Sequence, residues 1–222
     1  MNGQLVVITG ANRGIGLELA RIYRAEGATV VGVCRSGSAE LADTGAEVVE
    51  GVDLQKPETL ARLEEALRGR SVHVLVCNAG ILNSEGLDDL DFDSITAQFE
   101  VNAVGPLRVV AALRGQLARG AKVALITSRM GSIEDNTSGG YYGYRMSKAA
   151  LNAAGRSLAI DLRKQEVAVA ILHPGYVQTR MTDFKGDVTP AESAANLKRR
   201  IDELELSTSG QFRHANGQPL PW

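Results

Sequence analysis

The sequence predicts an α/β fold, a doubly wound parallel sheet of about seven strands with helices on both faces. Short apolar runs rich in β-branched residues alternate with longer stretches of helical character. These runs are apolar throughout, without alternation, which is typical of parallel strands covered on both faces. No linker, low-complexity tract or internal repeat divides the 222 residues. We therefore expect a single domain over residues 1–222.

The apolar runs and the helical stretches between them predict seven strands and five helices. The expected strands are Leu5–Thr9, Thr29–Cys34, Glu47–Val52, Val72–Cys77, Lys122–Thr127, Val167–His173 and a short seventh around Phe212. The expected helices are Ile15–Glu26, Pro57–Leu67, Ile95–Leu117, Tyr144–Lys164 and Ala191–Leu204. Pro57 and Pro190 each suit the first turn of a helix, and Thr189 is placed to cap the last one. This alternation predicts βαβ units with right-handed crossovers.

Composition and charge narrow the classes of function. Hydrophobic residues make up 44% and charged residues 23%, as in ordinary globular proteins. The formal net charge of -2 favours neither nucleic acid nor an anionic membrane as a partner. The chain shows no signal peptide or membrane-spanning run, so we expect a cytoplasmic protein. Cys34 and Cys77 each lie in an apolar run and are interpreted as buried, reduced thiols.

A glycine-rich turn joins the first strand to the first helix. Glycines there permit a tight turn, a close approach of the backbone to a pyrophosphate and close helix–strand packing. The N-terminus of the helix offers free N–H groups to the phosphates. This context predicts a Rossmann-type dinucleotide site that includes Gly10, Asn12, Arg13, Gly14, Ile15 and Gly16.

The end of the second strand predicts the choice of cofactor. An acidic residue at this place commonly binds the ribose 2′-hydroxyl of NAD. Here the strand ends in Val33-Cys34-Arg35, and Arg13 lies within the glycine turn. Two guanidinium groups favour a 2′-phosphate, so we expect NADP(H). The alternative is that both arginines are only solvated surface residues.

A tyrosine and a lysine open the fourth expected helix. The four-residue spacing of Tyr144 and Lys148 places them on one helical face. A cation near a phenol is expected to lower its pKa and to favour proton transfer near neutral pH. Because Tyr-x-x-x-Lys is a common pattern, it gains meaning only from the motifs around it.

Taken together, the motifs resemble the one-domain, classical type of short-chain dehydrogenase/reductase. The resemblance runs from Leu5 to about Thr179. It rests on the glycine turn, Asp53, Asn78-Ala79-Gly80, Asn102, Ser128, Tyr144 with Lys148, and Pro174-Gly175 with Thr179. The segments Ser128–Ile133 and Tyr142–Lys148 resemble the C-factor and sniffer carbonyl-reductase branch, and so does the ending Ser209–Phe212 with Pro221-Trp222.

The resemblance implies a catalytic role for four residues. Tyr144 would donate the proton to a carbonyl oxygen, or remove it from an alcohol. Lys148 would hold the nicotinamide ribose and lower the pKa of Tyr144. Ser128 would orient the substrate oxygen, and Asn102 would hold a water that links Lys148 to solvent. The implied chemistry needs no metal.

The resemblance also implies further cofactor contacts along the chain. Asp53 with its neighbour Leu54 would meet the adenine, and the Asn78-Ala79-Gly80 segment would line the adenine ribose. Pro174, Val177 and Thr179 would lie against the nicotinamide.

Several residues compete for these roles. Tyr141 and Tyr142 have no lysine four residues later. Ser132 is a rival to Ser128, but Ser128 directly follows the expected strand end. We therefore interpret Ser132 as structural, or as a residue that contacts the site only through another side chain. Ser147 is expected to point away from the reacting phenol and to serve in packing.

Three further features are interpreted as structural. His73 and His173 lie in apolar runs without metal-ligand spacing, and Trp222 is expected to be a packing anchor. Only a short segment from Thr179 to about Pro190 separates the sixth strand from the last helix, which predicts an open substrate pocket.

The sequence therefore predicts an NADPH-dependent oxidoreductase that acts on a small or medium carbonyl or alcohol. The alternative is an NADP(H)-binding signalling or sensor protein with incidental turnover. Self-association as a homodimer or a homotetramer would use the helices at Ile95–Leu117 and Tyr144–Lys164.

Overall fold

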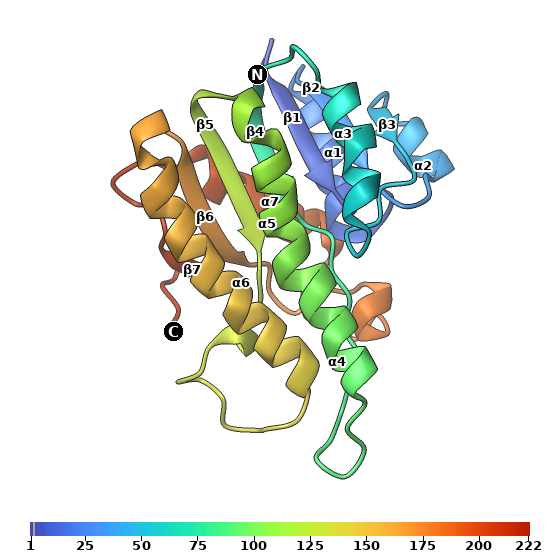
Figure 1. Ribbon diagram of the computed structural model, residues 1–222, viewed down its shortest axis with the longest axis vertical. Helices are drawn as coiled ribbons and strands as arrows, with labels where there is room; N and C mark the ends of the chain where they lie inside the picture. The colour runs from blue at the N-terminus through green and yellow to red at the C-terminus, as the bar shows by residue number, and fades with distance from the viewer. Residues whose placement is uncertain (2) are drawn as a thin grey trace.

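The computed structural model describes residue 1 and residues 3–222 and shows one seven-stranded sheet, in the order β3-β2-β1-β4-β5-β6-β7 (Figure 1). All six strand pairs are parallel. The strands are β1 (Leu5–Thr9), β2 (Thr29–Val33), β3 (Glu47–Val49), β4 (Val72–Cys77), β5 (Leu117–Ile126), β6 (Ala168–His173) and β7 (Phe212–His214). The predicted Rossmann-type parallel sheet is confirmed.

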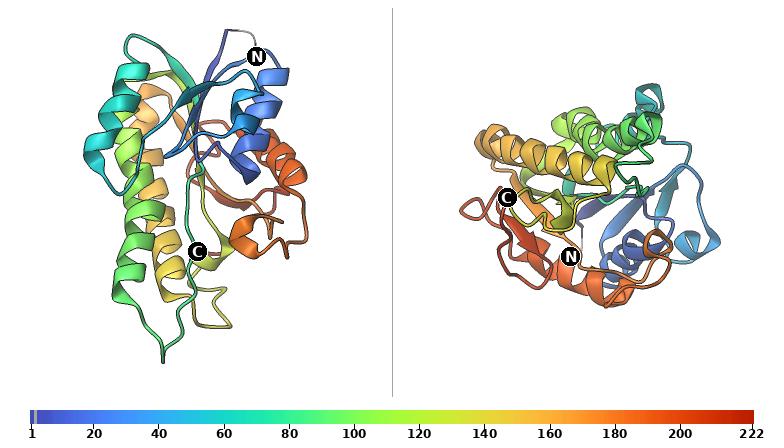
Figure 2. Two further views of the ribbon diagram at one scale, coloured as in Figure 1. Left: turned by 90° about the vertical axis from the view of Figure 1, so that its right-hand side faces the viewer. Right: turned by 90° about the horizontal axis from the view of Figure 1, so that it is seen from below.

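The α-helices cover both faces of the sheet (Figure 2). They are α1 (Gly14–Ala25), α2 (Ala39–Ala42), α3 (Ala61–Ala66), α4 (Phe92–Phe99), α5 (Gly105–Leu113), α6 (Tyr142–Asp161) and α7 (Pro190–Asp202). Helices α3, α5 and α6 pack over the face to which β1 contributes Val7. Helices α1, α2 and α7 pack over the other face, to which β1 contributes Val6 and Ile8. Successive residues of β1 thus enter opposite cores, because side chains alternate along a strand.

The expected helix Ile95–Leu117 is wrong in its continuity. The structure has α4, then a π-helical turn over Glu100–Val104, then α5, and the chain is already in β5 at Leu117. Pro106 has no N–H and cannot donate the α-helical hydrogen bond to the carbonyl of Asn102, four residues earlier. A π-type turn at this place accommodates that missing bond and carries Asn102 toward the site.

Other differences lie at the ends of elements. Strand β3 ends at Val49, three residues before the expected end, and β2 ends one residue early at Val33. Sequence reasoning missed α2, which Ser38 caps by accepting a hydrogen bond from the Leu41 amide at 3.2 Å. The caps expected for the last helix are present, since Pro190 is at its first turn and Thr189 accepts from the Glu192 amide at 3.2 Å.

The strand order places the functional loops together. Strands β1, β4, β5 and β6 are adjacent and parallel, so their carboxyl ends meet at one edge of the sheet. The chain order reverses between β1 and β4, and ligands of open α/β sheets bind at such a switch point. Within the described residues, no helix is both long and apolar enough to cross a membrane.

Candidate active site

The glycine turn after β1 packs directly on the loop after β4. Gly10 has a φ of +66°, and a Cβ at this position would lie 2.8 Å from the Cα of Ala79. A Cβ on Gly16 would lie 2.3 Å from the Gly10 carbonyl oxygen. The Asn78 side chain donates to the carbonyls of Thr9 and Gly10, both at 3.1 Å. Only glycine fits at positions 10 and 16 of this turn. The hydrogen bonds from the Asn78 side chain hold the backbone at the start of the turn in place.

The same turn is tied to the segment that follows β2. Asn12 donates from Nδ2 to the Ser36 carbonyl at 3.0 Å, and Ser38 donates to the Asn12 carbonyl at 2.8 Å. Because Arg13 follows Asn12 and Arg35 precedes Ser36, these bonds place the two arginines on adjoining segments. Both arginines are exposed, and neither forms an ion pair within the described part of the chain. Two guanidinium groups are thus free to meet an anion there.

The two residues predicted to contact the adenine, Asp53 and Leu54, differ in burial. Asp53 is partly exposed, and its carboxylate accepts from the Gln55 amide at 3.1 Å. Leu54 is 7% exposed and belongs to the core, where its Cβ would lie 2.8 Å from a Cβ on Gly105. Ile15 packs against the core on the side of α1, and Gly14 has a φ of +55°.

Tyr144, Lys148 and Ser128 meet at the carboxyl edge of β5. The first two turns of α6 carry Tyr144 and Lys148, and Ser128 lies two residues after the end of β5. The Lys148 ammonium lies 5.7 Å from the centre of the Tyr144 ring and donates to the Ile126 carbonyl at 2.9 Å. All three residues are buried. Ser128 is a hydrogen-bonding neighbour of the Tyr144 phenol, so the structure brings the predicted phenol, ammonium and hydroxyl together.

Burial controls the protonation of this group. It raises the pKa of Tyr144 to about 12, an effect that the neighbouring Ser128 hydroxyl opposes. Burial also lowers the pKa of Lys148 to about 8. The expected lowering of the Tyr144 pKa by Lys148 is not seen here, because burial of the phenol dominates and only the Ser128 hydroxyl opposes it. A protonated phenol at neutral pH can donate a proton to a carbonyl oxygen.

Asn102 and Ser147 form a hydrogen-bonded chain that reaches the backbone of Tyr144. The fully buried Asn102 side chain accepts from the Ile81 amide at 2.9 Å and donates to the Ile81 carbonyl at 2.8 Å and to Ser147 Oγ at 3.0 Å. Ser147 in turn donates to the Tyr144 carbonyl at 2.8 Å. The expected packing role of Ser147 thus extends to holding the backbone of Tyr144. A Cβ on Gly80 would lie 3.2 Å from Asn102 Oδ1 and 3.6 Å from Lys148 Nζ.

The loop after β6 closes the other side of the site. Pro174 is held through its carbonyl, which accepts from Ser193 at 2.8 Å, and Val177 is 4% exposed. A Cβ on Gly14 would lie 3.4 Å from Thr179 Cγ2, so Thr179 lies against the glycine turn. The short segment beyond it exposes an aromatic side chain, since Phe184 is 65% exposed.

Sequence reasoning missed a buried carboxylate at the N-terminus of α6. Glu85 is 4% exposed and accepts from Ser94 Oγ at 2.7 Å, Gln98 Nε2 at 2.6 Å and the Gly143 amide at 3.3 Å. The helix itself has no side-chain cap, because its N-cap residue Tyr141 makes no such bond. Glu85 therefore takes the place of a cap for the helix that carries Tyr144. A Ser-Glu-Gly sequence in an expected loop gave no signal of this burial.

The competing side chains have other partners. Ser132 is buried and donates to the main-chain oxygen of Trp222 at 3.1 Å, which supports a structural role. Tyr141 is 39% exposed and has a left-handed backbone. His173 stacks edge-on against His214 at 4.9 Å, and burial first, then the His214 charge, lowers its pKa to about 3.

Comparison with known proteins shows a family and several relatives. The family model described as short chain dehydrogenase matches residues 4–189. The chain is 42% identical to 1-hydroxy-2-glutathionyl-2-methyl-3-butene dehydrogenase of Rhodococcus sp. over 98% of this chain and 99% of the relative. It is 44% identical to C-signal of Myxococcus xanthus over 68% of this chain and 93% of that protein. Among solved structures, NADPH-bound carbonyl reductase from chicken fatty liver superposes with a TM-score of 0.90 at 27% identity, covering 100% of both chains.

Proposed function

We propose, from the premise that this chain belongs to the short-chain dehydrogenase family, that it is an NADPH-dependent carbonyl reductase. The family resemblance in the sequence is confirmed, and the chain is an oxidoreductase by that membership. The observation that carries the proposal is the meeting of Tyr144, Lys148 and Ser128 at the edge of the sheet where the glycine turn also lies.

The chain's own residues would carry the proton chemistry. When bound, the nicotinamide supplies a hydride to the carbonyl carbon. Ser128 would donate a hydrogen bond to the carbonyl oxygen, and Tyr144 would give it a proton as negative charge develops. Lys148 would hold the nicotinamide ribose and assist proton return to Tyr144, with Asn102 placing a water on that path. In the reverse direction Tyr144 would act as the base.

The residues of the glycine turn fit a dinucleotide phosphate. Side chains larger than glycine would collide at Gly10 and Gly16, so the turn leaves room for a close backbone approach. Exposed Arg13 and Arg35 beside Cys34 support a 2′-phosphate and hence NADP(H) over NAD(H). The presence of NADPH in the chicken carbonyl reductase supports the same choice.

An NADP(H)-binding signalling or sensor protein is the second candidate. The identity to C-signal over two thirds of this chain favours it. Binding alone, however, needs only the glycine turn and ribose contacts, whereas this chain also buries the Tyr144 phenol beside Ser128. We therefore place catalysis first. A homodimer or homotetramer and a cytoplasmic location stay predictions.

A panel of substrates tests the function directly. NADPH consumption would be followed by nicotinamide absorbance with ketones, aldehydes and quinones. The reverse reaction would be followed with a hydroxylated glutathione conjugate, the class named for the Rhodococcus relative. Turnover above the uncatalysed rate with at least one substrate supports the enzyme, while NADPH binding without any turnover favours the sensor.

A single substitution tests the role of the phenol. We expect Tyr144→Phe to lower kcat by about 10²–10⁴-fold, the usual contribution of general acid–base catalysis, with little change in the Kd for NADPH. Tyr142→Phe is the matched control and should keep the unmutated rate. A near-normal rate in Tyr144→Phe would remove Tyr144 from the mechanism.

A further inference from the structure

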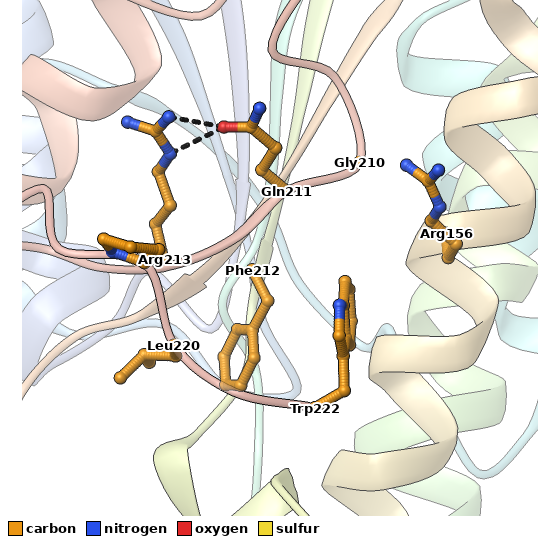
Figure 3. A pocket seen from close by; sticks show the side chains of 8 residues that line it. Arg156, Gly210, Gln211, Phe212, Arg213, Leu220 and Trp222 are labelled. Atoms are coloured by element: carbon orange, nitrogen blue, oxygen red, sulfur yellow. Dashed lines mark hydrogen bonds between the residues drawn. The ribbon is translucent and has the colours of Figure 1, made fainter.

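The chain's last residues fold back onto the edge of the sheet beside the candidate active site. Residues 219–222, here named the C-terminal strap, follow a turn after β7. The Leu220 amide donates to the Phe212 carbonyl at 3.0 Å, and Arg213 forms an antiparallel bridge with Pro219. The Trp222 ring packs beside the Phe212 ring, with 5.6 Å between their centres and 37° between their planes (Figure 3). The strap is therefore anchored on β7, whose Phe212 is 3% exposed.

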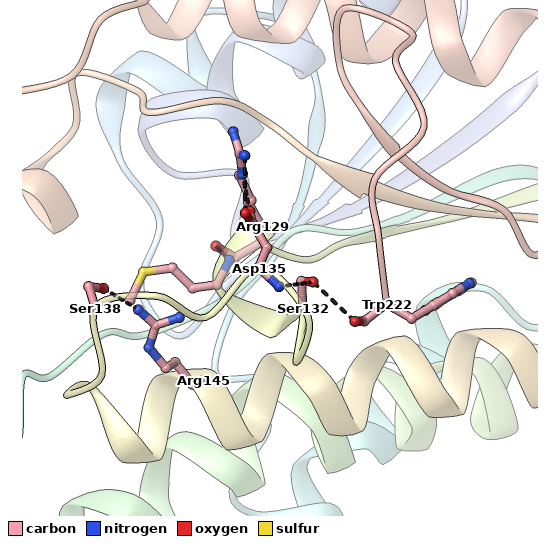
Figure 4. Close-up of polar contacts among 8 residues, drawn as sticks. Arg129, Ser132, Asp135, Ser138, Arg145 and Trp222 are labelled. Carbon is pink, nitrogen blue, oxygen red and sulfur yellow. Dashed lines mark hydrogen bonds and ion pairs between the residues drawn. The ribbon is translucent and has the colours of Figure 1, made fainter.

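The strap ends in a set of converging hydrogen bonds. The main-chain oxygen of Trp222 accepts from Ser132 Oγ at 3.1 Å (Figure 4). It also accepts from the Ile133 amide at 3.1 Å and from the Glu134 amide at 2.9 Å. All three donors belong to one turn of the loop between β5 and α6. Three donors on one oxygen are a specific arrangement, since a main-chain oxygen has two lone pairs.

This turn continues directly into the catalytic segment. The Ser128 carbonyl accepts from the Gly131 amide at 2.9 Å, and the Arg129 carbonyl accepts from the Ser132 amide at 2.9 Å. Ser132 Oγ also accepts from the Asp135 amide at 3.1 Å. A displacement at Ser132 is therefore passed through two consecutive hydrogen-bonded turns to Ser128.

Open space adjoins the strap at Trp222. Cavities of about 510 and 320 Å³ lie against it, and both are lined by Trp222 and Arg156. The smaller one is also lined by Gly131 and Ile133 of the loop. On its other side the turn packs on α6, where a Cβ on Gly131 would lie 2.7 Å from the Lys148 carbonyl carbon and Asn152 Nδ2 donates to the Gly131 carbonyl at 3.3 Å. On the side of the open space, the hydrogen bonds to Trp222 hold the turn.

We propose that the C-terminal strap positions the Ser128 hydroxyl, with Trp222 as a positioning residue that acts through Ser132 and the turn after β5. The inference rests on the proposed function, in which Ser128 orients the substrate oxygen. Trp222 itself does not meet the substrate. Its ring fixes the strap on Phe212, and its main-chain oxygen fixes the turn.

Two substitutions test the strap. Trp222→Ala removes the ring that anchors it, and Ser132→Ala removes one of the three donors. We expect each to lower kcat for carbonyl reduction by about tenfold, since small misplacements of a catalytic group can lower rates up to about 10²-fold. The Kd for NADPH should be unchanged. Phe92→Ala, at an exposed aromatic of α4, and Ser207→Ala, at an exposed serine, are the matched controls and should keep the unmutated kcat.

A double-mutant cycle shows whether the effect passes through Ser128. In a Ser128→Ala background, Trp222→Ala should lower kcat by less than about twofold, because the hydroxyl it positions is gone. Equal losses in both backgrounds would overturn the proposal, as would a kcat within about twofold of the unmutated enzyme for both strap variants. A lower kcat with Ser132→Ala but not with Trp222→Ala would also overturn the proposal. It would indicate that Ser132 contacts the substrate directly. If Ser128→Ala alone leaves kcat unchanged, the proposed role of Ser128 fails, which is a different result.

Discussion

Replacement of Glu85 by alanine tests the buried carboxylate at the start of α6. The substitution removes the acceptor of Ser94 Oγ, Gln98 Nε2 and the Gly143 amide, at 2.7, 2.6 and 3.3 Å. Gln98 is fully buried, so its amide would lose a partner that water cannot easily replace. A hydrogen bond to a charged group contributes about 1.5–3 kcal/mol, and the long bond to Gly143 contributes least. Because the three bonds share one group they do not add, and we expect a loss of about 3–5 kcal/mol in the free energy of unfolding.

Urea unfolding followed by circular dichroism measures this loss. For a chain of this size the same loss lowers Tm by roughly 6–20 °C, at about 2–4 °C for each kcal/mol. Glu85→Gln keeps the shape of the side chain and should lose less. Glu64→Ala removes an exposed carboxylate on α3 and should stay within about 0.5 kcal/mol. A loss below about 1 kcal/mol for Glu85→Ala would show that the network does not hold the helix start.

Three further predictions concern chemistry at the site. Lys148 is charged below its lowered pKa of about 8 and neutral above it, so kcat/KM for NADPH should be level at low pH and fall as pH rises through about 8. In Lys148→Arg, which stays charged, a pH–rate profile should lack that fall; the same fall in both would exclude Lys148 as its cause. Arg35→Ala should raise the KM for NADPH by about 10–100-fold with little change for NADH, and adding Cys34→Asp should shift the preference to NADH. Equal kcat/KM for NADPH and NADH in the unmutated enzyme would refute the NADP(H) choice. Burial raises the pKa of Cys77 to about 12 and, with the Glu50 charge, raises that of Cys34. Mild alkylation should therefore leave activity intact, and mass spectrometry should find both thiols labelled only after unfolding.

The sequence predicted the central strands β1 and β4 well because both are largely apolar runs. β1 and β4 have the expected bounds, and the glycine turn between β1 and α1 lies where its spacing placed it. These features depend on local sequence, since a strand covered on both faces must be apolar along its whole length. The meeting of Tyr144 with Ser128 followed from the motif order combined with the rule that parallel strands share one carboxyl edge.

The features that sequence reasoning missed depend on tertiary contacts. The helical periodicity of the sequence continues through α4 and α5, so it does not reveal the π-helical turn at Asn102. The only signal of that turn in the sequence is Pro106, four residues after Asn102. The burial of Glu85 results from α4 and α6 packing together, where a Cβ on Gly143 would lie 2.5 Å from Gln98 Nε2. The raised pKa of Tyr144 is also a tertiary effect, because a spacing of four places a lysine nearby but does not show how much water the fold removes.

The strand order has a consequence for how the chain is made. β1 leaves the ribosome early, but its neighbour β4 ends only at Cys77, which at about 5–20 residues per second appears roughly 3–14 s later. During this interval β1 can pair only with β2, and one of its edges is open to wrong partners. From β4 onward every new strand joins the free edge left by the strand before it. Nascent chains of this protein are therefore most exposed to aggregation before β4 emerges, and later synthesis extends a sheet that already exists.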